Sequence, residues 1–592
     1  MSMQSSIRCG LCRIEYQIYL MLTSALLIHA NDVSAQIVPN AGVIQREVEA
    51  ARPEKTKPEH AQVLPQPAAN DDPNAPHFLV NQIDIEGAEL FDNKQLAQVV
   101  EKAIGQSLSI QQLQSYGQLL SDFYRSQGWL ARVVLPKQDF SSGKIRIVII
   151  EARYSGTELN SESGRADAEF VREQIIGNQQ AGSALQLQTL ESDLLKANDL
   201  PGILTTAVLA PGEHAGDTKI KLKLNDTSLV SGYLNYSNQG LRSIGSNQYQ
   251  GNVAVNNPMG RGDQFSVQAV GSENMVSVRS EYSFLLADLG TRMSIYGSHL
   301  QYQLGGSFAN LHAEGEGRLL GGVLSQSLIR QAEQNLSASL TLENRLNQNN
   351  QLKIQNRLHD VNAMIFTLKG DKTDYWFGKA INNAALNLGL GYLNIEMAEE
   401  KNSDARTARA QGEFLKYNFN LNRTEYLNQD WQLSLAFNGQ WAAKNLDASQ
   451  KFALGGPNAI RAYPVNEAMG DSGWLLNIEL QRELGYGLQG LLFADTGGIK
   501  VNQRLWSGVG NSPNTYLLSG VGIGLRWSDQ KHWQASALLG LPVTSNPARD
   551  RFNHNSDGTR AGDPAGALGA RVRRDLHERQ LHDPRRVGPL DR

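Results

Sequence analysis

Residues 431–438 read WQLSLAFN, and in this stretch apolar W, L, L and F alternate with polar or small residues. Successive side chains of a β-strand point to opposite faces, so this period of two predicts a strand with one apolar and one polar face. Most of the chain after Leu229 is therefore predicted to be an all-β domain. The same rhythm recurs at 336–343, 415–422 and 517–527.

Alternation alone fits two architectures, a soluble β-sandwich with apolar faces inside and a membrane barrel with apolar faces toward lipid. Strand-like segments of about 10 to 13 residues favour the barrel, because a tilted membrane strand needs that length. Trp431 and Trp441 bracket one segment at about the spacing of the two interfacial aromatic girdles. Short and long connections also alternate, as periplasmic turns and surface loops do. We therefore predict a barrel.

Fifteen strand-like segments are expected between Leu229 and Val543. An up-and-down barrel with both ends on one side needs an even number, so a sixteenth strand is expected after Val543. The expected strands start near residues 229, 247, 263, 275, 292, 317, 334, 357, 381, 410, 430, 472, 486, 515 and 532.

The composition changes after Arg560. Residues 561–592 hold seven Arg and three Pro, and neither Lys nor an aromatic residue. We expect no lipid-facing strand in this atypical tail, because an Arg at the bilayer midplane costs about 2–4 kcal/mol. A reading-frame shift near Arg560 that replaced the last strand is our hypothesis, and a soluble basic tail is the alternative. An aromatic-terminated strand encoded in the neighbouring frame would support the first interpretation.

Residues 1–35 are predicted to be a signal peptide. Arg8 and Arg13 precede an apolar stretch over residues 18–28, and the small residues of 33–35 supply a cleavage pattern. A membrane anchor is the alternative, but the apolar stretch is too short for one. The processed chain is therefore expected to be exported.

The overall composition excludes several classes of protein. Both cysteines, Cys9 and Cys12, lie in the predicted signal peptide, so neither disulfides nor cysteine metal sites are expected in the processed chain. The net charge of -4 gives no basic excess for a nucleic-acid partner. A mean hydropathy of -0.38 is too low for a polytopic helical membrane protein.

The region between the signal peptide and the barrel is predicted to hold a linker and two small modules. Within residues 36–77, a short helix over Asn40 to Ala51 precedes a proline-rich extended linker. Residues 78–153 show the order strand, helix, helix, strand, strand, and residues 154–227 repeat it more loosely. Two α+β modules in tandem are therefore expected before a barrel at 228–560.

Two short motifs occur in the expected barrel: residues 454–464 read LGGPNAIRAYP, and residues 492–497 read LFADTG. Together with the order of the segments, they resemble the outer-membrane transporters of two-partner secretion, the haemolysin secretion/activation family, whose small modules are called POTRA domains. The resemblance covers about residues 36 to 560. The first motif matches G-G-x-x-[VI]-R-G-[YF], although Ala462 replaces the usual Gly, and the second matches F-x-D-x-G.

The resemblance implies a fold and a function. Two α+β POTRA modules in the periplasm would precede an all-β barrel of 16 antiparallel strands in the outer membrane of a Gram-negative bacterium. The chain would export a dedicated large exoprotein of haemolysin or adhesin type, bound unfolded or extended by the POTRA modules; activation of that cargo stays open. The alternative is an assembly factor that inserts other barrels, and two modules, rather than more, favour the translocator.

The resemblance also implies a site inside the barrel, where the long loop enters the lumen and Arg461 pairs with Asp495 on the inner wall. Guanidinium and carboxylate can form a two-pronged contact. Without the resemblance, a solvated loop Arg and a strand-end Asp would be the ordinary interpretations. The expected site residues are Gly455, Gly456, Ile460, Arg461 and Tyr463 in the loop motif, and Phe493, Asp495 and Gly497 in the wall motif.

The helix at Asn40 to Ala51 resembles the N-terminal helix that can plug the pore in this family. The alternative, which the sequence favours equally, is that these residues form a disordered tail. No catalytic residue, metal or cofactor is expected, because the chain lacks G-x-S-x-G and H-E-x-x-H. His299, His312 and His359 are scattered and are interpreted as ordinary strand or loop residues. A surface enzyme carried on a barrel is therefore disfavoured.

Overall fold

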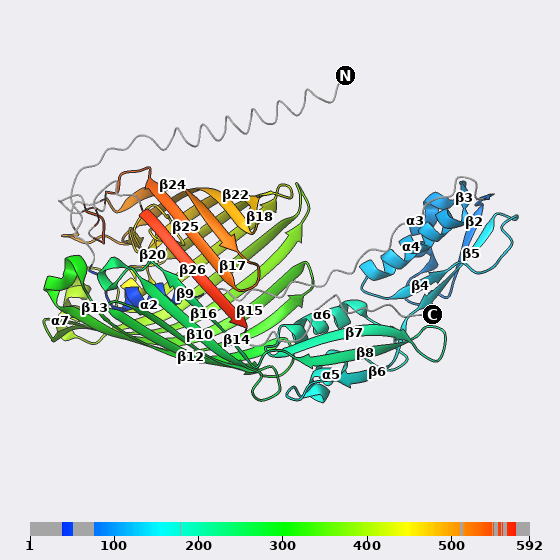
Figure 1. Ribbon diagram of the computed structural model, residues 1–592, viewed down its shortest axis with the longest axis horizontal. Helices are drawn as coiled ribbons and strands as arrows, with labels where there is room; N and C mark the ends of the chain where they lie inside the picture. Colours follow the sequence, from blue (N-terminus) through cyan, green and yellow to red (C-terminus); the bar gives the residue numbers. More distant parts are fainter. Residues whose placement is uncertain are drawn as a thin grey trace, which may run out of the picture.

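Figure 1 shows a large barrel beside two small α+β modules. Among the described residues, no helix is both long and apolar enough to cross a membrane. The predicted signal peptide and most of the predicted linker lie outside the described part of the chain. This computed structural model describes residues 38–50, 52, 76–177, 179–509, 513–547, 549, 554–557 and 559, and the backbone of 565–575.

The first module has the predicted order of elements, except that its first strand is divided into β1 and β2. Strand β5 lies between β2, to which it is parallel, and β4, to which it is antiparallel. Helix α4 begins with a capping box, in which Ser109 and Gln112 each accept the other's backbone N–H. The elements are β1 (His77–Leu79), β2 (Gln82–Glu86), α3 (Asn93–Val100), η1 (Glu101–Ala103), β3 (Ser107–Ser109), α4 (Ile110–Ser126), β4 (Ala131–Val134) and β5 (Lys144–Glu151).

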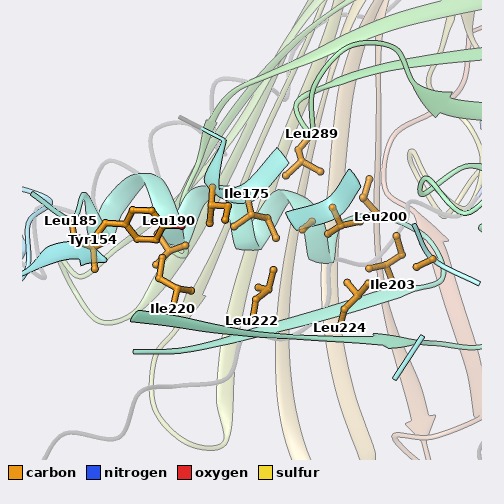
Figure 2. Close-up of a cluster of buried hydrophobic side chains, with 14 of the residues drawn as sticks. Tyr154, Ile175, Leu185, Leu190, Leu200, Ile203, Ile220, Leu222, Leu224 and Leu289 are labelled. Atoms are coloured by element: carbon orange, nitrogen blue, oxygen red, sulfur yellow. The ribbon is translucent and has the colours of Figure 1, made fainter. Parts of the chain in front are cut away.

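The second module repeats this plan with one three-stranded sheet in the order β6-β8-β7. Two helices cover the sheet, and their apolar side chains form the core shown in Figure 2 with those of β8. Ile220, Leu222 and Leu224 of β8 alternate with more exposed residues, so one face of the strand is buried. The elements are β6 (Arg153–Ser161), α5 (Ala168–Ile176), α6 (Leu187–Asn198), β7 (Ile203–Pro211) and β8 (Asp217–Asp226).

Sixteen antiparallel strands form the closed barrel, in chain order with β26 pairing back to β9. The predicted strand number is thus confirmed. They are β9 (Val230–Ser237), β10 (Gln248–Asn256), β11 (Gln264–Ser272), β12 (Met275–Leu285), β13 (Thr291–Gln303), β14 (Ala313–Arg330), β15 (Gln334–Gln351), β16 (Ile354–Asp374), β17 (Ala380–Ile395), β18 (Gly412–Tyr426), β19 (Trp431–Ala442), β22 (Ser472–Gly485), β23 (Leu488–Lys500), β24 (Thr515–Ser528), β25 (Trp533–Pro542) and β26 (Ala565–Asp575).

All fifteen predicted strands exist, and the largest offset, four residues, occurs at β14, which begins at 313 rather than 317. The strands are longer than predicted in the middle of the barrel, where β16 has 21 residues. Short elements in the connections are η2 (Arg242–Ile244), η3 (Gly306–Leu311), α7 (Ala398–Arg406), η4 (Ala448–Gln450), β20 (Phe452–Ala453) and β21 (Met469–Gly470).

The outer surface of the barrel is apolar, which decides between the sandwich and the barrel. Leu342, Met364 and Leu390 lie opposite one another on three adjacent strands, and each is more than a third exposed. Polar residues on the other face, such as Gln268 and Arg279, are buried within the lumen. Apolar outside and polar inside is the arrangement of a membrane barrel.

The expectation that residues 561–592 hold no barrel strand is wrong for residues 565–575. The backbone of β26 pairs with β25 and with β9, so no open edge is left between them. Pairing in a β-ladder requires only backbone N–H and C=O groups. Every residue except proline supplies both, and arginine is no exception. Leu568, Ala570 and Val572 also alternate with Gly569, Arg571 and Arg573, a period of two that the composition argument overlooked. The reading-frame hypothesis loses its missing-strand argument and stays a prediction about the gene.

The second module is fixed to one end of the barrel. Leu289, in the turn between β12 and β13, inserts into the module's apolar core (Figure 2). Arg330, at the end of β14, is 4% exposed and donates to Asp199 with Nε at 2.6 Å and Nη2 at 2.8 Å. A turn residue, Arg261, also pairs with Asp167 at 3.3 Å. Three successive barrel turns thus contribute to one docking interface.

Asp226, the last residue of β8, holds the loop between β6 and α5 of the second module, close to the point where the chain enters the barrel. Its carboxylate accepts hydrogen bonds from Ser163 Oγ at 2.7 Å and from the backbone N–H groups of Arg165 at 3.0 Å and Ala166 at 3.2 Å. Burial alone raises the pKa of Asp226, but these hydrogen bonds outweigh it and hold that pKa below its ordinary value. The carboxylate is therefore charged and ordered beside the start of β9.

Candidate functional site

Two elements fill part of the barrel lumen. Helix α2 (Ala41–Ala50) begins at Asn40, whose side chain accepts the N–H of Val43, and its apolar residues are buried. The second element is the lumen loop, which we define as residues 443–471 between β19 and β22. Figure 1 shows both α2 and β20, a short strand of the lumen loop, inside the barrel.

The lumen loop carries the predicted arginine, and the wall carries its predicted partner. Arg461 donates to Asp495 of β23 from Nε at 2.9 Å, from Nη2 at 2.8 Å and from the backbone N–H at 3.0 Å. Asp495 is 2% exposed, whereas Leu492 on the same strand is 55% exposed, so the carboxylate faces the lumen. The guanidinium also lies 3.7 Å from the ring centroid of Phe493, close enough for a cation–π contact.

A second carboxylate, which the motif comparison missed, completes the charge balance. Glu479 of β22 contacts Nη1 of Arg461, and Arg526 of β24 donates to Glu479 Oε1 at 2.7 Å. Asn477 of β22 donates to Asp495 at 2.8 Å and to the carbonyl of Ala459 at 2.8 Å. The alternation of residues 476–481 gives a signal that could have identified both, because odd-numbered polar residues share one face of that strand.

Glycines make room for the loop against the wall. A Cβ on Gly455 would lie 2.1 Å from the carbonyl oxygen of Pro464, and one on Gly497 would lie 2.6 Å from Leu454. Gly456 has φ +128, a conformation that favours glycine. Ile460, which belongs to the loop, is fully buried. These residues shape the turn that presents the arginine.

Ala462 departs from the family motif, and the wall accommodates its methyl group. A Cβ on Gly520 of β24 would lie 2.4 Å from Ala462 Cβ, and one on Gly540 of β25 would lie 2.9 Å from its Cα. Tyr463 continues the contact, since its hydroxyl donates to the carbonyl of Thr544 at 2.6 Å. The loop is therefore seated on β24 and β25 as well as paired to β23.

Helix α2 is held by polar contacts on two sides. Arg46 donates to Asn466 of the lumen loop at 2.6 Å, and Asn466 donates to Glu47 at 3.2 Å. On the wall side, Glu49 pairs with Arg279 of β12 at 2.9 Å. Backbone N–H groups at the start of the helix are also bound, since Ala41 donates to Asn349 at 2.8 Å. The helix thus bridges the lumen loop and the barrel wall.

His359, interpreted from the sequence as an ordinary residue, is buried in a charged cluster. Its Nδ1 lies 2.6 Å from Asp447 of the lumen loop, and its Nε2 lies 3.0 Å from Glu400 of α7. The histidine therefore joins β16, the base of the lumen loop and the loop that carries α7. Its position is consistent with a structural role.

Family models match most of the described chain. The model for haemolysin secretion/activation protein ShlB/FhaC/HecB matches residues 216–527, and the model for a POTRA domain of ShlB type matches residues 78–152. Heme/hemopexin transporter protein HuxB of Haemophilus influenzae is 25% identical over 555 residues, which cover 90% of this chain and 96% of that protein. Outer membrane transporter CdiB of Escherichia coli is 22% identical over 435 residues, covering 71% of this chain and 72% of that protein.

Solved structures share the fold. CdiB from Escherichia coli aligns with a TM-score of 0.62 at 19% identity, covering 86% of this chain and 93% of that one. BamA from Haemophilus ducreyi lacking POTRA domains 1-3 aligns with a TM-score of 0.51 at 12% identity, covering 84% and 100%. With its POTRA region in the periplasm and its barrel in the outer membrane, the chain belongs to the haemolysin secretion/activation family of two-partner secretion transporters.

Proposed function

We propose that this chain exports one dedicated, large, β-rich exoprotein, which passes through the barrel in extended form. The observation that carries the proposal is that α2 and the lumen loop occupy part of the lumen and are held to the barrel wall by side-chain contacts and not by sheet pairing. A cavity of about 960 Å³ adjoins them and is lined by wall side chains that include Asn235, Gln250 and Lys416. Displacement of the two elements would widen this polar bore.

In this proposal the Arg461–Asp495 pair holds the lumen loop in its seat while the transporter rests. The contact is two-pronged and buried, so it fixes both the position and the orientation of the loop. Phe493, Gly455, Gly456, Ile460, Tyr463 and Gly497 shape or support that seat. The loop motif and the wall motif therefore act as one closure.

The second POTRA module offers an edge at which extended cargo can add a strand. β7 is an edge strand, and the N–H and C=O of Thr205 both bind the side chain of Asn198, away from β8. In an antiparallel strand every second residue points its backbone groups to the same side, so those of Ala207 and Leu209 face that edge as well. We assign this edge to cargo capture by strand addition.

The relatives support a protein cargo without identifying it. HuxB is described as a heme/hemopexin transporter protein and CdiB as an outer membrane transporter. For this chain we propose that folding of the exoprotein outside the cell supplies the driving force, because the periplasm offers no ATP. No catalytic residue is assigned, and the alternative is insertion of other barrels into the outer membrane.

Deletion of the gene separates these two functions. Culture medium and outer-membrane fractions of the deletion strain are compared with those of the parent and of a strain complemented with the full chain. Loss of one large protein from the medium, restored on complementation and with normal outer-membrane barrels, is the expected result. General loss of barrels would instead favour the assembly function, and unchanged secretion would reject the export proposal.

A further inference from the structure

The turn between β16 and β17 exposes three consecutive aromatic residues, and we call residues 375–378 the aromatic turn. Tyr375 is 61% exposed, Trp376 82% and Phe377 88%. Successive strands of the barrel are antiparallel, so this turn lies at the end of the barrel that also carries the docking interface. Large apolar groups that lie together on a surface usually mark a contact with a partner or a membrane.

Hydrogen bonds hold the aromatic turn in one position. The backbone N–H of Trp376 donates to Asp374 at 3.3 Å. Arg423 of β18 donates to the same carboxylate from Nη1 at 2.6 Å and from Nη2 at 3.2 Å. Its Nε also donates to Glu425 at 2.9 Å, so the guanidinium lies between two carboxylates. The exposed rings are therefore presented by an ordered turn.

The residues that hold the aromatic turn belong to the lipid-facing surface of the barrel. Asp374 is six positions from Leu368 on β16, and Arg423 is two positions from Leu421 on β18. Even separations place residues on the same face of a strand, and both leucines are exposed on the outer face. The aromatic turn therefore continues the lipid-facing surface and not the wall of the bore.

The residues around the aromatic turn have the composition of a membrane–water interface. Lys372 and Lys379 flank the aromatic residues, and both are exposed. Aromatic rings are enriched at the headgroup level of a membrane, where lysine side chains can extend to lipid phosphates. The nearby carboxylate of Asp374 is already paired with Arg423. A phospholipid surface thus complements both the rings and the ammonium groups.

The aromatic turn is also joined to the docking interface. The hydroxyl of Tyr375 donates to Glu333 at 2.6 Å, and the backbone N–H of Thr373 donates to the carbonyl of Glu333 at 2.8 Å. Glu333 lies in the turn that follows β14, and β14 ends at Arg330, which binds Asp199 of the second module. This turn therefore contacts the aromatic turn on one side and the second module on the other.

We infer that the aromatic turn is a membrane contact that positions the second module. Trp376 and Phe377 enter the headgroup region of the periplasmic leaflet, and the two flanking lysines bind lipid phosphates. Tyr375 connects this anchorage to the turn between β14 and β15, so that the second module is held at a fixed distance from the membrane surface. The inference requires a barrel in the outer membrane but does not require export of cargo.

Quenching by a labelled lipid tests the membrane contact. Both cysteines, Cys9 and Cys12, lie in the predicted signal peptide, so Phe377→Cys gives the processed chain one site for a fluorescent label. The full processed chain is inserted into vesicles of phosphatidylethanolamine and phosphatidylglycerol, with and without a nitroxide on the lipid headgroup. The nitroxide is expected to quench the label, because position 377 lies at headgroup level. Should this variant not fold, Lys379→Cys labels the other side of the turn.

The matched control is Glu213→Cys, at an exposed position of the turn between β7 and β8 in the second module. Its label should keep its fluorescence in the same vesicles. Heat-dependent migration on gels checks that each barrel is folded. Equal fluorescence with and without nitroxide at position 377, or crosslinking of that position to cargo and not to lipid, would overturn the membrane contact.

Mobility of the second module tests the positioning role, with fluorescence anisotropy of a label at Glu213→Cys as the measurement. Trp376→Ser combined with Phe377→Ser is expected to lower the anisotropy in vesicles. Tyr375→Phe removes only the hydroxyl and should lower it while quenching at position 377 persists. Leu352→Ser, in an exposed turn at the opposite end of the barrel, should leave the anisotropy unchanged.

Unchanged anisotropy in the folded double variant would overturn the positioning role. Neither measurement includes cargo, so both outcomes are independent of whether the gene-deletion test supports export.

Discussion

At the scale of single residues, Arg461 belongs to a balanced set of charges. Asp495 and Glu479 both contact it, and all three side chains are buried, while Arg526, which contacts Glu479, is partly exposed. Two positive and two negative groups thus lie together. Buried ion pairs of this kind contribute little net stability, but removing one partner leaves an uncompensated charge. The set therefore favours a single position of the lumen loop more than it stabilises the barrel.

Substitution of Arg461 is expected to loosen the loop while the barrel stays assembled. Arg461→Ala leaves Asp495 unpaired at a cost of about 3–5 kcal/mol, and cargo secretion should fall strongly because a lumen loop without a fixed position obstructs the bore. Arg461→Lys retains the charge but not the two-pronged contact, so secretion should be intermediate. Cargo in the medium is measured by immunoblotting, with heat-dependent gel migration as the folding check.

Two further variants sharpen this prediction. Arg504→Ala, an exposed arginine of the next outer connection, should secrete at the parental level. Asp495→Asn added to Arg461→Ala removes the unpaired charge and should recover part of the lost thermal stability. Full secretion by a folded Arg461→Ala variant would refute the role assigned to the pair.

At the scale of elements, the exposed edge of β7 is blocked by a side chain only near its start. Asn198 of α6 binds the backbone of Thr205, while Ala207 and Leu209 present theirs farther along the same edge. Side chains cap the start of the edge without covering its length. An added strand would therefore be expected to pair with the later part of β7.

Proline at this edge tests strand addition directly. Ala207→Pro removes one outward N–H, and proline is tolerated best on edge strands. Loss of that hydrogen bond should reduce capture of cargo by the full chain about two- to tenfold. Ala207→Ser keeps the N–H and should capture cargo like the parent, which is measured by photocrosslinking of cargo in the periplasm. Equal capture by both variants would place the cargo elsewhere.

At the scale of the whole molecule, the docking interface fixes the position of the second module relative to the barrel. Leu289 is 6% exposed within the module's core, and Arg330, at the end of β14, binds Asp199. Hydrophobic insertion and a two-pronged ion pair together resist both sliding and rotation of the module. In the proposed function, cargo added to the edge of β7 would therefore keep a constant position relative to the bore.

Removal of the inserted side chain should free the module. Leu289→Ala is expected to weaken docking by about 2–5 kcal/mol, the range for deletion of a buried leucine side chain. The barrel should stay folded, while limited proteolysis near the junction at Asp226 becomes faster and secretion declines. Leu286, in the same turn, is 57% exposed, and Leu286→Ala is the matched control. Unchanged proteolysis in Leu289→Ala would show that docking does not depend on this residue.

The sequence predicts a structural feature well when the pattern that indicates it lies among residues that are neighbours in the chain. Strands are predictable because alternation is local, and all fifteen expected strands exist. β26 was missed because composition was weighed over the whole tail, although Leu568, Ala570 and Val572 keep the local rhythm. Local patterns predict elements well even where the average composition is unfavourable.

Most contacts between segments that are far apart in the chain could not be predicted from the sequence. The meeting of Arg461 with Asp495 was expected only through the family resemblance. Glu479 lies on a recognisable polar face, but nothing local shows which loop it meets. Glu467 of the lumen loop and Asn546, in the connection between β25 and β26, are separated by 79 positions, and their contact forms only when both segments have folded. Such pairings are set by tertiary packing, for which a single sequence has no periodic signal.

The pairing of β26 with β9 controls when the barrel can close. These are the first and the last strands of the barrel, so the contact has the greatest sequence separation in the sheet and the largest loop-closure entropy to overcome. Nearly the whole polypeptide must reach the periplasm before that contact can form. Until then two strand edges stay unsatisfied, and such intermediates aggregate readily. We therefore expect biogenesis of this transporter to require periplasmic chaperones that cover the open strand edges.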